Sequence, residues 1–247
     1  MSGIVAATLH APLPVHVLDI SNTVKPDIAG LLSAGGWFGK QQQLRIVNNG
    51  MVNTLDIPAS LDGADITLVN ASGGLIGGAR NAGTAIKTRA HIKIDNAGSI
   101  NGGGGGGGSG GNTNVQFQAP TYIPAVGYGY GGAGGDGQGF GESNLTIYAS
   151  DSGAAGTSTG VIYGIRDGGG FGGGGEWAQA YGGDGGTGGN WGLGGNYGGF
   201  SSVSGAGGYV SGGVSSGPDG QFAGYYIDGN DFVTWINTGT RIGRVLA

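Results

Sequence analysis

Short apolar runs recur in the first hundred residues, each followed by Asn, Gly and another apolar residue. The three copies are at 45–52, 67–76 and 93–100. Ile92 and Ile94 alternate with polar residues, which is the two-residue period of a strand, and Asn and Gly supply turns because they tolerate positive φ. Asn48, Asn70 and Asn96 are 22 and 26 residues apart, a spacing that predicts stacked β-coils or a strand–turn–strand array.

The remaining patterns predict more strands and little helix. Residues 145–150 form a further alternating run, and residues 231–243 close the chain with another β-rich segment. Only the stretch 27–33 has the composition of a short helix, which Gly35 and Gly36 would end. We therefore expect an all-β or irregular fold with an N-terminal β-strand repeat, a short C-terminal β segment and little α-helix.

Glycine accounts for 64 of the 247 residues, about a quarter, against roughly 7% in an ordinary globular protein. Residues 102–213 hold 45 of these glycines, so the composition divides the chain. We expect residues 1–100 to be a β-rich attachment and oligomerisation part, residues 101–213 a glycine-rich display domain, and residues 214–247 a C-terminal β segment. Collagen is excluded, because glycine keeps no strict three-residue register and there are only seven prolines.

Three physical forms are open to the glycine region: a flexible linker, an amyloid-like stack, or a bundle of polyproline-II helices packed side by side. In such a bundle, three residues per turn place glycine on every face that meets a neighbour, and backbone groups bond between helices. Runs such as 102–108 and 182–189 are long enough for several turns. Aromatic residues interrupt the runs, whereas flexible linkers lack them, so we favour the polyglycine-II-like bundle.

The chain has a formal net charge of -5 and no cysteine. Its few Lys and Arg residues are scattered, so no basic stripe could neutralise a run of phosphates, and we expect no nucleic-acid partner. No run approaches the roughly eighteen apolar residues of a membrane span, and residues 1–21 lack a secretory signal pattern. We expect synthesis in a cytoplasm, no membrane insertion, and an exit such as the release of virus particles by lysis.

Nucleotide and calcium motifs are present only as fragments. The Gly-x-Gly-x-x-Gly string at 127–132 lies in a stretch rich in glycine, and no helix follows it to bind pyrophosphate. The string at 131–136 matches the first six positions of a calcium β-roll repeat, but no tandem copy follows nine residues later. We interpret Asp136 and Asp184 as solvated loop carboxylates, and we expect no metal and no cofactor.

The sequence contains no recognisable catalytic constellation. His10, His16 and His91 lie far apart without a second ligand at metal spacing, and we interpret them as surface or strand histidines. Ser109 lies among glycines but precedes no helix, as a nucleophile elbow requires. Three carboxylates could serve in glycan cleavage, although no feature of the sequence brings them together: Glu142, Asp167 and Glu176. We expect no catalytic residue and no enzyme activity.

The strand at 94–101 that runs into glycines 102–108, followed by glycine motifs with aromatic residues, resembles the distal ends of tailed-bacteriophage tail fibres and tail-tip proteins. The closing segment 231–243 is similar to the C-terminal ends of siphophage central-fibre or receptor-binding proteins. The likeness to the glycine-rich tip adhesins of T-even-like phages implies polyglycine-II helices in a sandwich, whose hypervariable loops contact an outer-membrane protein or a glycan. This resemblance covers residues 92–247, and the first ninety residues depart from those adhesins.

The resemblance implies a non-enzymatic adhesin at the distal tail fibre or tail tip of the virion, with a host cell-surface receptor as its partner. It also implies that the N-terminal part attaches to other tail or fibre proteins, and that the chain forms a homotrimer. Rigid, amphipathic aromatic rings suit such recognition. The candidate receptor contacts are the aromatic residues in or beside the glycine runs: Tyr128, Tyr130, Phe140, Phe171, Trp177, Tyr181, Trp191, Tyr197, Phe200 and Tyr209.

Two other functions stay open. The alternative is a structural tail-tip or fibre component without direct host contact, in which the aromatic residues only cap glycine helices and fill a modest core. A third class, an ice- or wall-binding protein, would need regular Thr ladders, which the sequence lacks. Trp235 is flanked by apolar residues, and we expect it to pack within or between subunits.

Overall fold

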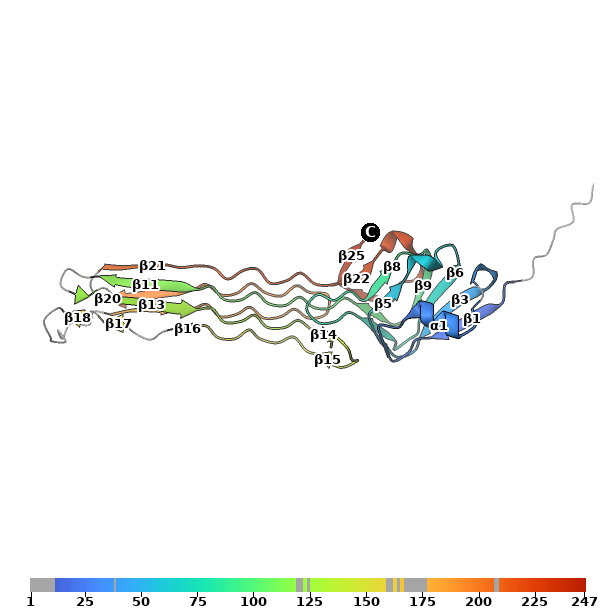
Figure 1. Cartoon of the computed structure of the whole chain (residues 1–247), viewed down its shortest axis with the longest axis horizontal. Helices are drawn as coiled ribbons and strands as arrows, with labels where there is room; N and C mark the ends of the chain where they lie inside the picture. Colours follow the sequence, from blue (N-terminus) through green and yellow to red (C-terminus); the bar gives the residue numbers. More distant parts are fainter. Residues whose placement is uncertain are drawn as a thin grey trace, which may run out of the picture.

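The molecule is elongated, with a group of stacked strands at one end, long glycine-rich segments leading away from it, and a second group of strands at the far end (Figure 1). We call these parts the base, the stem and the tip. The computed structural model describes residues 12–37, 39–118, 122–123, 125–158, 162–163, 165–166, 177–206 and 209–247.

Three parallel sheets form the base, and each circuit of the chain, here called a rung, adds a strand to successive sheets. The first sheet contains β1 (Val15–Asp19), β3 (Gln43–Asn48), β6 (Asp65–Asn70), β9 (Ile92–Asn96) and β23 (Val233–Asn237). The second contains β2 (Thr23–Val24), β4 (Met51–Asn53), β7 (Leu75–Gly77), β10 (Ser99–Asn101) and β24 (Thr240–Ile242). The third contains β5 (Leu55–Ile57), β8 (Ile86–Thr88), β22 (Tyr225–Asp228) and β25 (Arg244–Leu246).

Alternate residues of these strands point into the base and form an aliphatic core. In the second sheet, Val52, Ile76 and Ile100 are paired in successive rungs, and all three are fully buried. Leu68 and Ile94 are paired and buried in the same way in the first sheet. Full burial of one such side chain contributes roughly 1.5–3 kcal/mol, so the stacked aliphatic rows hold each rung against the next.

One α-helix, α1 (Ile28–Ala34), follows β2 in the first rung. The Asp27 side chain accepts a hydrogen bond from the Gly30 N–H at 3.0 Å, which satisfies a donor of the first turn. Ile28 and Leu32 are buried in the core of the base, and Gly35 ends the helix. Besides α1, the described residues form short 3-10 helices η1 (Gly39–Gln41), η2 (Ala59–Leu61) and η3 (Asn230–Phe232). The prediction of a mostly β fold with little helix is confirmed.

A buried row of asparagines crosses three rungs of the base. The register pairs Asn48 with Asn70 and Asn70 with Asn96, the three positions that recur in the sequence. The Nδ2 group of each donates to the Oδ1 of the next at 2.8 Å, and Asn96 Nδ2 donates to the Thr238 carbonyl at 2.8 Å. Because an unpaired buried amide is costly, this row favours one register of the rungs.

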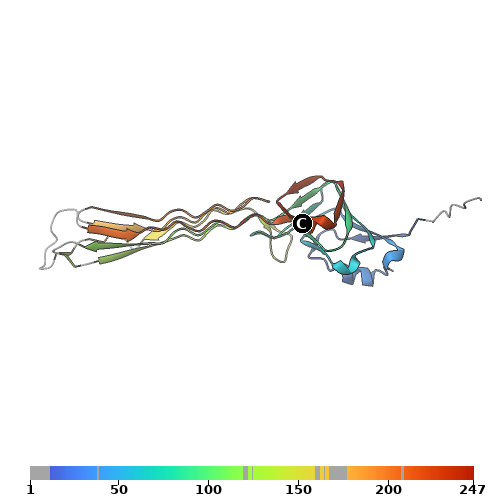
Figure 2. The same ribbon diagram turned by 90° about the horizontal axis from the view of Figure 1, so that it is seen from above.

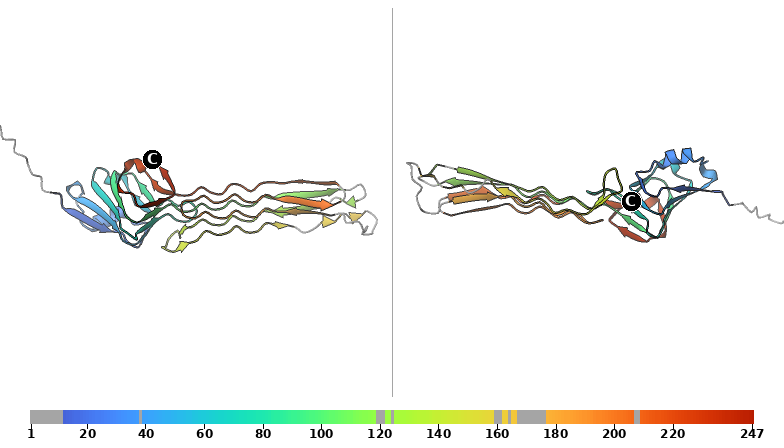
Figure 3. Two further views of the ribbon diagram at one scale, coloured as in Figure 1. Left: turned by 180° about the vertical axis from the view of Figure 1, so that it is seen from behind. Right: turned by 90° about the horizontal axis from the view of Figure 1, so that it is seen from below.

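The stem is an insertion within the fourth rung of the base. The chain leaves after β10 and returns at β22, which pairs with β8 of the third rung and with β25 of the fifth (Figure 3). The strands in 225–246 therefore extend the sheets built by residues 15–101, and residues 214–247 do not form a separate part as the sequence predicted. The register of these parallel strands follows from the matching of their buried apolar residues. Strands that are far apart in the sequence can therefore be neighbours in one sheet.

Extended segments run side by side between base and tip (Figure 2). Their backbone hydrogen bonds define six such segments. Numbered 1 to 6 in chain order, they are 102–112, 131–138, 149–156, 182–190, 194–200 and 214–224. Backbone hydrogen bonds join neighbours at every third residue: segment 1 donates to segment 2 from Gly104, Gly107 and Gly110, with N···O distances of 2.7–2.8 Å. From this bonding, segments 3, 4 and 5 form one layer, and segments 2, 1 and 6 form the layer against it.

Glycine occupies the positions at which two segments meet. In segment 4 every third residue is exposed, namely Asp184, Thr187 and Asn190, and the residues between them are glycines. A Cβ on Gly185 would meet a carbonyl oxygen of segment 2, and a Cβ on Gly186 one of segment 5, both far inside 3.0 Å. No glycine of segment 4 has positive φ, so these positions need glycine for space and not for backbone conformation.

The two corner segments confirm this relation between glycine and neighbours. Segments 3 and 6 each bond to only two other segments, and they contain the least glycine: Gly153 and Gly156 in segment 3, and Gly217, Gly220 and Gly224 in segment 6. Segment 1 lies between segments 2 and 6 and faces segments 4 and 5, and it contains the run 102–108. A segment that is covered by other segments on more sides thus contains more glycine.

The tip consists of short antiparallel strands. One sheet contains β16 (Thr157–Ser158), β13 (Ala125–Tyr130), β11 (Thr113–Gln118) and β21 (Tyr209–Gly213). A second contains β17 (Ile162–Tyr163), β19 (Trp177–Tyr181) and β20 (Ser202–Ala206), and β12 (Tyr122–Ile123) pairs with β18 (Ile165–Arg166). Val115, Ala178 and Ala180 are fully buried between the sheets, and the small side chains allow close packing.

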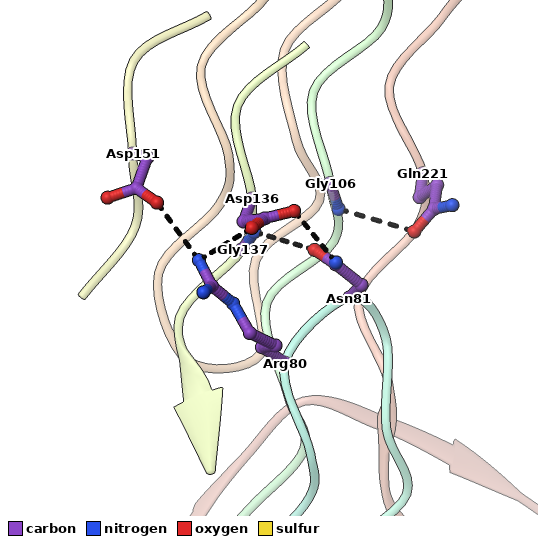
Figure 4. A network of polar contacts seen from close by, with 7 residues as sticks. All are labelled: Arg80, Asn81, Gly106, Asp136, Gly137, Asp151 and Gln221. Atoms are coloured by element: carbon purple, nitrogen blue, oxygen red, sulfur yellow. Dashed lines mark hydrogen bonds and ion pairs between the residues drawn. The ribbon is translucent and has the colours of Figure 1, made fainter. Parts of the chain in front are cut away.

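A loop of the base holds the root of the stem (Figure 4). The loop 78–85 joins β7 to β8, and its Arg80 Nη2 lies 3.1 Å from Asp136 and 3.0 Å from Asp151, which belong to segments 2 and 3. Asn81 donates to Asp136 at 3.0 Å and accepts from the Gly137 N–H at 2.8 Å. Strands β14 (Gly139–Phe140) and β15 (Ile147–Tyr148) pair beside this loop, and β15 lies within the run 145–150 predicted as a strand.

Candidate functional site

The structure separates the predicted aromatic contacts into three groups along the molecule. Those in tip strands are Tyr128, Tyr130, Trp177, Tyr181 and Tyr209; those on the stem are Tyr197 and Phe200; and those at the stem root are Phe140 and Trp191. Phe171 lies outside the described residues.

Two tyrosines of β13 are exposed on one face of the tip. Tyr128 and Tyr130 are 45% and 56% exposed, and their rings stack with centroids 6.4 Å apart and planes 21° apart. The strand alternates tyrosine with glycine, so Gly129 points to the opposite face. A Cβ on Gly129 would meet the backbone of Tyr181 in the second sheet, and glycine therefore lets the sheets approach while the tyrosines face solvent.

An open groove of ≈ 330 Å³ lies beside this pair, where the stem meets the tip. Its lining combines the two tyrosines with the polar segment Asn112, Thr113 and Asn114. No Asp, Glu, Lys, Arg or His lines the groove, so aromatic contact and neutral hydrogen bonds are what it can offer a partner. The sequence contains a signal for these polar residues, because Asn112, Thr113 and Asn114 interrupt the glycine run where strand β11 begins. A search for aromatic residues alone did not find them.

The other tip aromatics lie in the second sheet and at the edge of the first. Tyr181 is 39% exposed and donates from its hydroxyl to Gln179 Oε1 at 2.6 Å. Trp177 begins β19, where its backbone pairs with Ala206. Tyr209 begins β21, where its backbone pairs with Gln118. All three belong to strands of the tip, Tyr181 and Trp177 in the second sheet and Tyr209 in the edge strand of the first.

The stem carries exposed rings of its own. Tyr197 and Phe200 are 64% and 72% exposed and lie three residues apart in segment 5, so both occupy the row that faces away from neighbours. Phe222 of segment 6 is 77% exposed and was not among the predicted contacts. The guanidinium of Arg244 lies over its ring at 5.1 Å from the centroid.

Two predicted contacts lie at the root instead of on a display surface. Phe140 is fully buried, and its ring packs edge-on against Trp191 with centroids 5.8 Å apart. Gly77 of the base has no side chain where the Phe140 ring lies, since a Cβ there would clash with it. The prediction of Phe140 as a surface contact was therefore wrong, and half-buried Trp191 joins it in fixing the stem to the base.

The carboxylates and histidines considered for catalysis are dispersed. Glu142 lies 3.8 Å from Lys25 at the surface, and Asp167 and Glu176 lie outside the described residues. His91 contacts Asp62, a pairing that the sequence did not predict: its backbone N–H donates to Asp62 Oδ1 at 2.9 Å, and its ring Nδ1 lies 2.8 Å from the same oxygen. These hydrogen bonds, the backbone bond foremost, lower the pKa of the Asp62 carboxyl.

Asp136 and Asp184, the two aspartates of the glycine runs, each contact another group of the protein. Asp136 is paired with Arg80, and Asp184 accepts a hydrogen bond from the Gly156 N–H at 2.8 Å. Within the described ranges, no three His, Cys, Asp or Glu side chains gather as a metal site would require. Among the same residues, no helix has the length and apolar character needed to cross a membrane.

A hydrogen-bonded stem thus holds the exposed Tyr128 and Tyr130 away from the base. The chain belongs to the family described as phage tail fibre adhesin Gp38, which it matches over residues 25–246. This match confirms the resemblance to tail-fibre adhesins and places the protein in a bacteriophage tail fibre. It also corrects the expectation that the first ninety residues depart from the family, because the match includes residues 25–91.

A similar solved structure is the gp37-gp38 adhesin tip complex of the bacteriophage S16 long tail fibre. It is 21% identical to this chain with a TM-score of 0.47, and the similarity covers 93% of this chain and 82% of that chain. No curated protein matches the sequence.

Proposed function

We propose that this adhesin binds a receptor on the host cell surface through its tip and has no enzymatic activity. The observation that carries the proposal is the exposed, stacked pair of Tyr128 and Tyr130 beside a neutral polar groove at the end of the stem farthest from the base. Tyrosines give a large contact area at a low cost in conformational entropy, and a groove with amide and hydroxyl groups adds directional bonds. The receptor is an outer-membrane protein or a glycan.

The proposed contact residues are the tip aromatics Tyr128, Tyr130, Trp177, Tyr181 and Tyr209. Tyr197 and Phe200 are exposed on the stem. We rank them below the tip aromatics as receptor contacts, because a receptor would have to lie along the stem to reach them. Phe171 lies outside the described residues, and its role as a receptor contact stays a prediction.

The experiment measures binding of the labelled, purified chain to susceptible bacteria and its competition with phage adsorption. Replacement of both Tyr128 and Tyr130 by Ala should weaken binding roughly 30-fold or more, since a buried aromatic anchor contributes on the order of 2 kcal/mol. Phe222→Ala is the matched control, because it removes an exposed ring at the stem root. A chain that neither binds susceptible cells nor competes with adsorption would refute the proposal.

We also propose that the end of the base opposite the stem attaches the adhesin to another tail-fibre protein. Strand β1 is the last strand of its sheet on that side, and its Val15 and Val17 are 53% and 59% exposed. Exposed apolar residues on a free strand edge suit docking by a partner protein. Val17→Lys should abolish co-purification with the fibre of the same phage and leave cell binding by the isolated adhesin unchanged. Normal co-purification of that variant would exclude this face.

For the stem, we propose that the glycine segments are polyglycine-II helices. The three-residue spacing of their inter-segment hydrogen bonds supports this, as does the exposure of every third residue in segment 4. Far-ultraviolet circular dichroism should give a polyproline-II-like signal that is lost cooperatively on heating. A random-coil spectrum at all temperatures would contradict the proposal.

The alternative function is a structural fibre component without host contact, in which case the purified chain would assemble with the fibre and would not bind cells. The predicted homotrimer stays a prediction. Light scattering distinguishes it from a monomer of 24.1 kDa.

A further inference from the structure

A polar groove of ≈ 370 Å³ runs along the side of the stem near its root, away from the tip. Segment 3 contributes Ser150, Asp151 and Ser152 to one wall, and segment 5 contributes Asn196 to the other. Segment 4 lies between them and contributes Thr187 and Asn190. The groove thus lies on the layer formed by segments 3, 4 and 5.

The shape of the groove follows from the three-residue repeat of segment 4. Gly188 and Gly189 line the groove without side chains, and Thr187 and Asn190 stand on either side of them in the exposed row. This exposed row holds three different polar residues in turn: Asp184, Thr187 and Asn190. The side chains of Thr187 and Asn190 stand in the row that faces away from the other segments, so they are open to the groove.

Hydrogen bonds within the groove orient its amides. Ser150 Oγ donates to Asn190 Oδ1 at 2.9 Å, and Asn196 Nδ2 donates to Thr187 Oγ1 at 2.5 Å. Within the described part of the chain, Asn190 Nδ2 and Asn196 Oδ1 carry no further hydrogen bond. Each amide thus keeps one group for a ligand, a donor on Asn190 and an acceptor on Asn196.

The electrostatics of the groove favour an uncharged ligand. Its one charged lining residue is Asp151, and Asp151 Oδ2 lies 3.0 Å from Arg80 Nη2 of the base (Figure 4). No Lys, Arg or His lines the groove to pair with a phosphate or carboxylate. A sugar hydroxyl both donates and accepts a hydrogen bond, which matches the mixture of amide and hydroxyl groups, and Leu193 offers apolar contact to the C–H face of a ring.

We propose that this groove binds neutral sugar rings of a cell-surface polysaccharide along the side of the stem. The site is separate from the receptor contact proposed for the tip. A weak second contact raises the effective concentration of the tip at the cell surface, and so strengthens attachment without any change in the tip itself.

Nuclear magnetic resonance of the isotope-labelled full chain tests this site directly. The probes are soluble maltohexaose, mannohexaose and chitohexaose, added at millimolar concentrations where weak binding is visible. We expect shifts of the Gly188, Gly189 and Asn190 amides and none at Gly129 of the tip. No shift in the groove with any of the three sugars would overturn the proposal. Equal shifts with a carboxylated oligogalacturonate would overturn the preference for a neutral ligand.

A double variant, Asn190→Ala with Asn196→Ala, separates the groove from the tip. Its affinity for the sugar should fall roughly tenfold or more, because two hydrogen-bonding groups are lost. Asp184→Ala is the matched control, since it lies in the same exposed row as Asn190 but outside the groove and should leave sugar binding unchanged. Receptor binding by the tip should persist in both variants, so a failure here is distinguishable from a failure of the proposed function. Unchanged sugar affinity in the double variant would refute the assignment.

Discussion

Gly107 lies in the middle of segment 1, where four other segments surround the chain, and its replacement by Ala tests the close packing of the stem. Its N–H donates to the Gly135 carbonyl at 2.7 Å, and a Cβ would meet the Gly186 carbonyl oxygen far inside 3.0 Å. The methyl group can be accommodated only if segments 1 and 4 move apart. The adjacent hydrogen bond from Gly186 N to Gly108 O, 2.7 Å long, would then be lost.

The expected loss of stability follows from these contacts. Overpacking of a tight interior costs roughly 1–3 kcal/mol, and each backbone hydrogen bond that is broken costs about 1 kcal/mol more. Loss of one or two bonds gives a total of about 2–5 kcal/mol. For a protein of this length, 1 kcal/mol corresponds to roughly 2–4 °C in Tm, so Gly107→Ala should lower Tm by about 4–20 °C.

Gly213→Ala is the matched control. Its nearest neighbour to a new Cβ is Asn114 Oδ1 at 3.6 Å, which is ordinary contact, and its φ is not positive. A Gly→Ala change at such a site stabilises by about 0.4–1 kcal/mol, because it restricts the unfolded chain. Thermal unfolding followed by circular dichroism compares the two. Equal Tm values for both variants would refute the reasoning that space, and not flexibility, requires glycine in the stem.

Three further changes test the base and its hold on the stem. Asn70→Ala removes the middle of the asparagine row and leaves buried groups of Asn48 and Asn96 unpaired, so urea unfolding should show a loss of about 2–4 kcal/mol. Arg80→Ala removes two partly exposed ion pairs, each worth about 0–1 kcal/mol, and the loss measured by urea unfolding should shrink as salt is added. The lowered pKa of Asp62 stabilises the fold above the ordinary carboxyl range, and this contribution disappears as the pH falls below about 4. Asp62→Asn should therefore flatten the acid side of a plot of Tm against pH.

Local rules allowed much of the base and stem to be predicted from the sequence. The alternation at Ile92 and Ile94 indicates a strand with one buried face, and Asp27 followed by Gly35 bounds a short helix. Asn48, Asn70 and Asn96 recur because each must pair with the next, so a contact between rungs leaves a regular spacing along the chain. In segment 4, glycine likewise occupies every position that meets a neighbouring segment, so the three-residue pattern of the sequence indicates which positions are covered.

The topology depends on contacts between distant residues and could not be derived in this way. Tyr225 continues a rung that stops at Asn101, and no local pattern links strands separated by the whole stem. The same limit applies to the candidate site. Phe140 and Tyr130 both follow glycines in the sequence, yet one fills the space left by Gly77 and the other faces solvent, because their neighbours come from different parts of the chain.

The claim that the tip determines host contact is tested most directly by an exchange of tips between two phages with different hosts. Residues 113–130, 157–181 and 202–213 would be replaced by their counterparts, with the base and stem kept, and adsorption of the assembled particles to both hosts would be measured. The account predicts that adsorption follows the donor of the tip. Particles that assemble normally but keep the host of the original base and stem would contradict it.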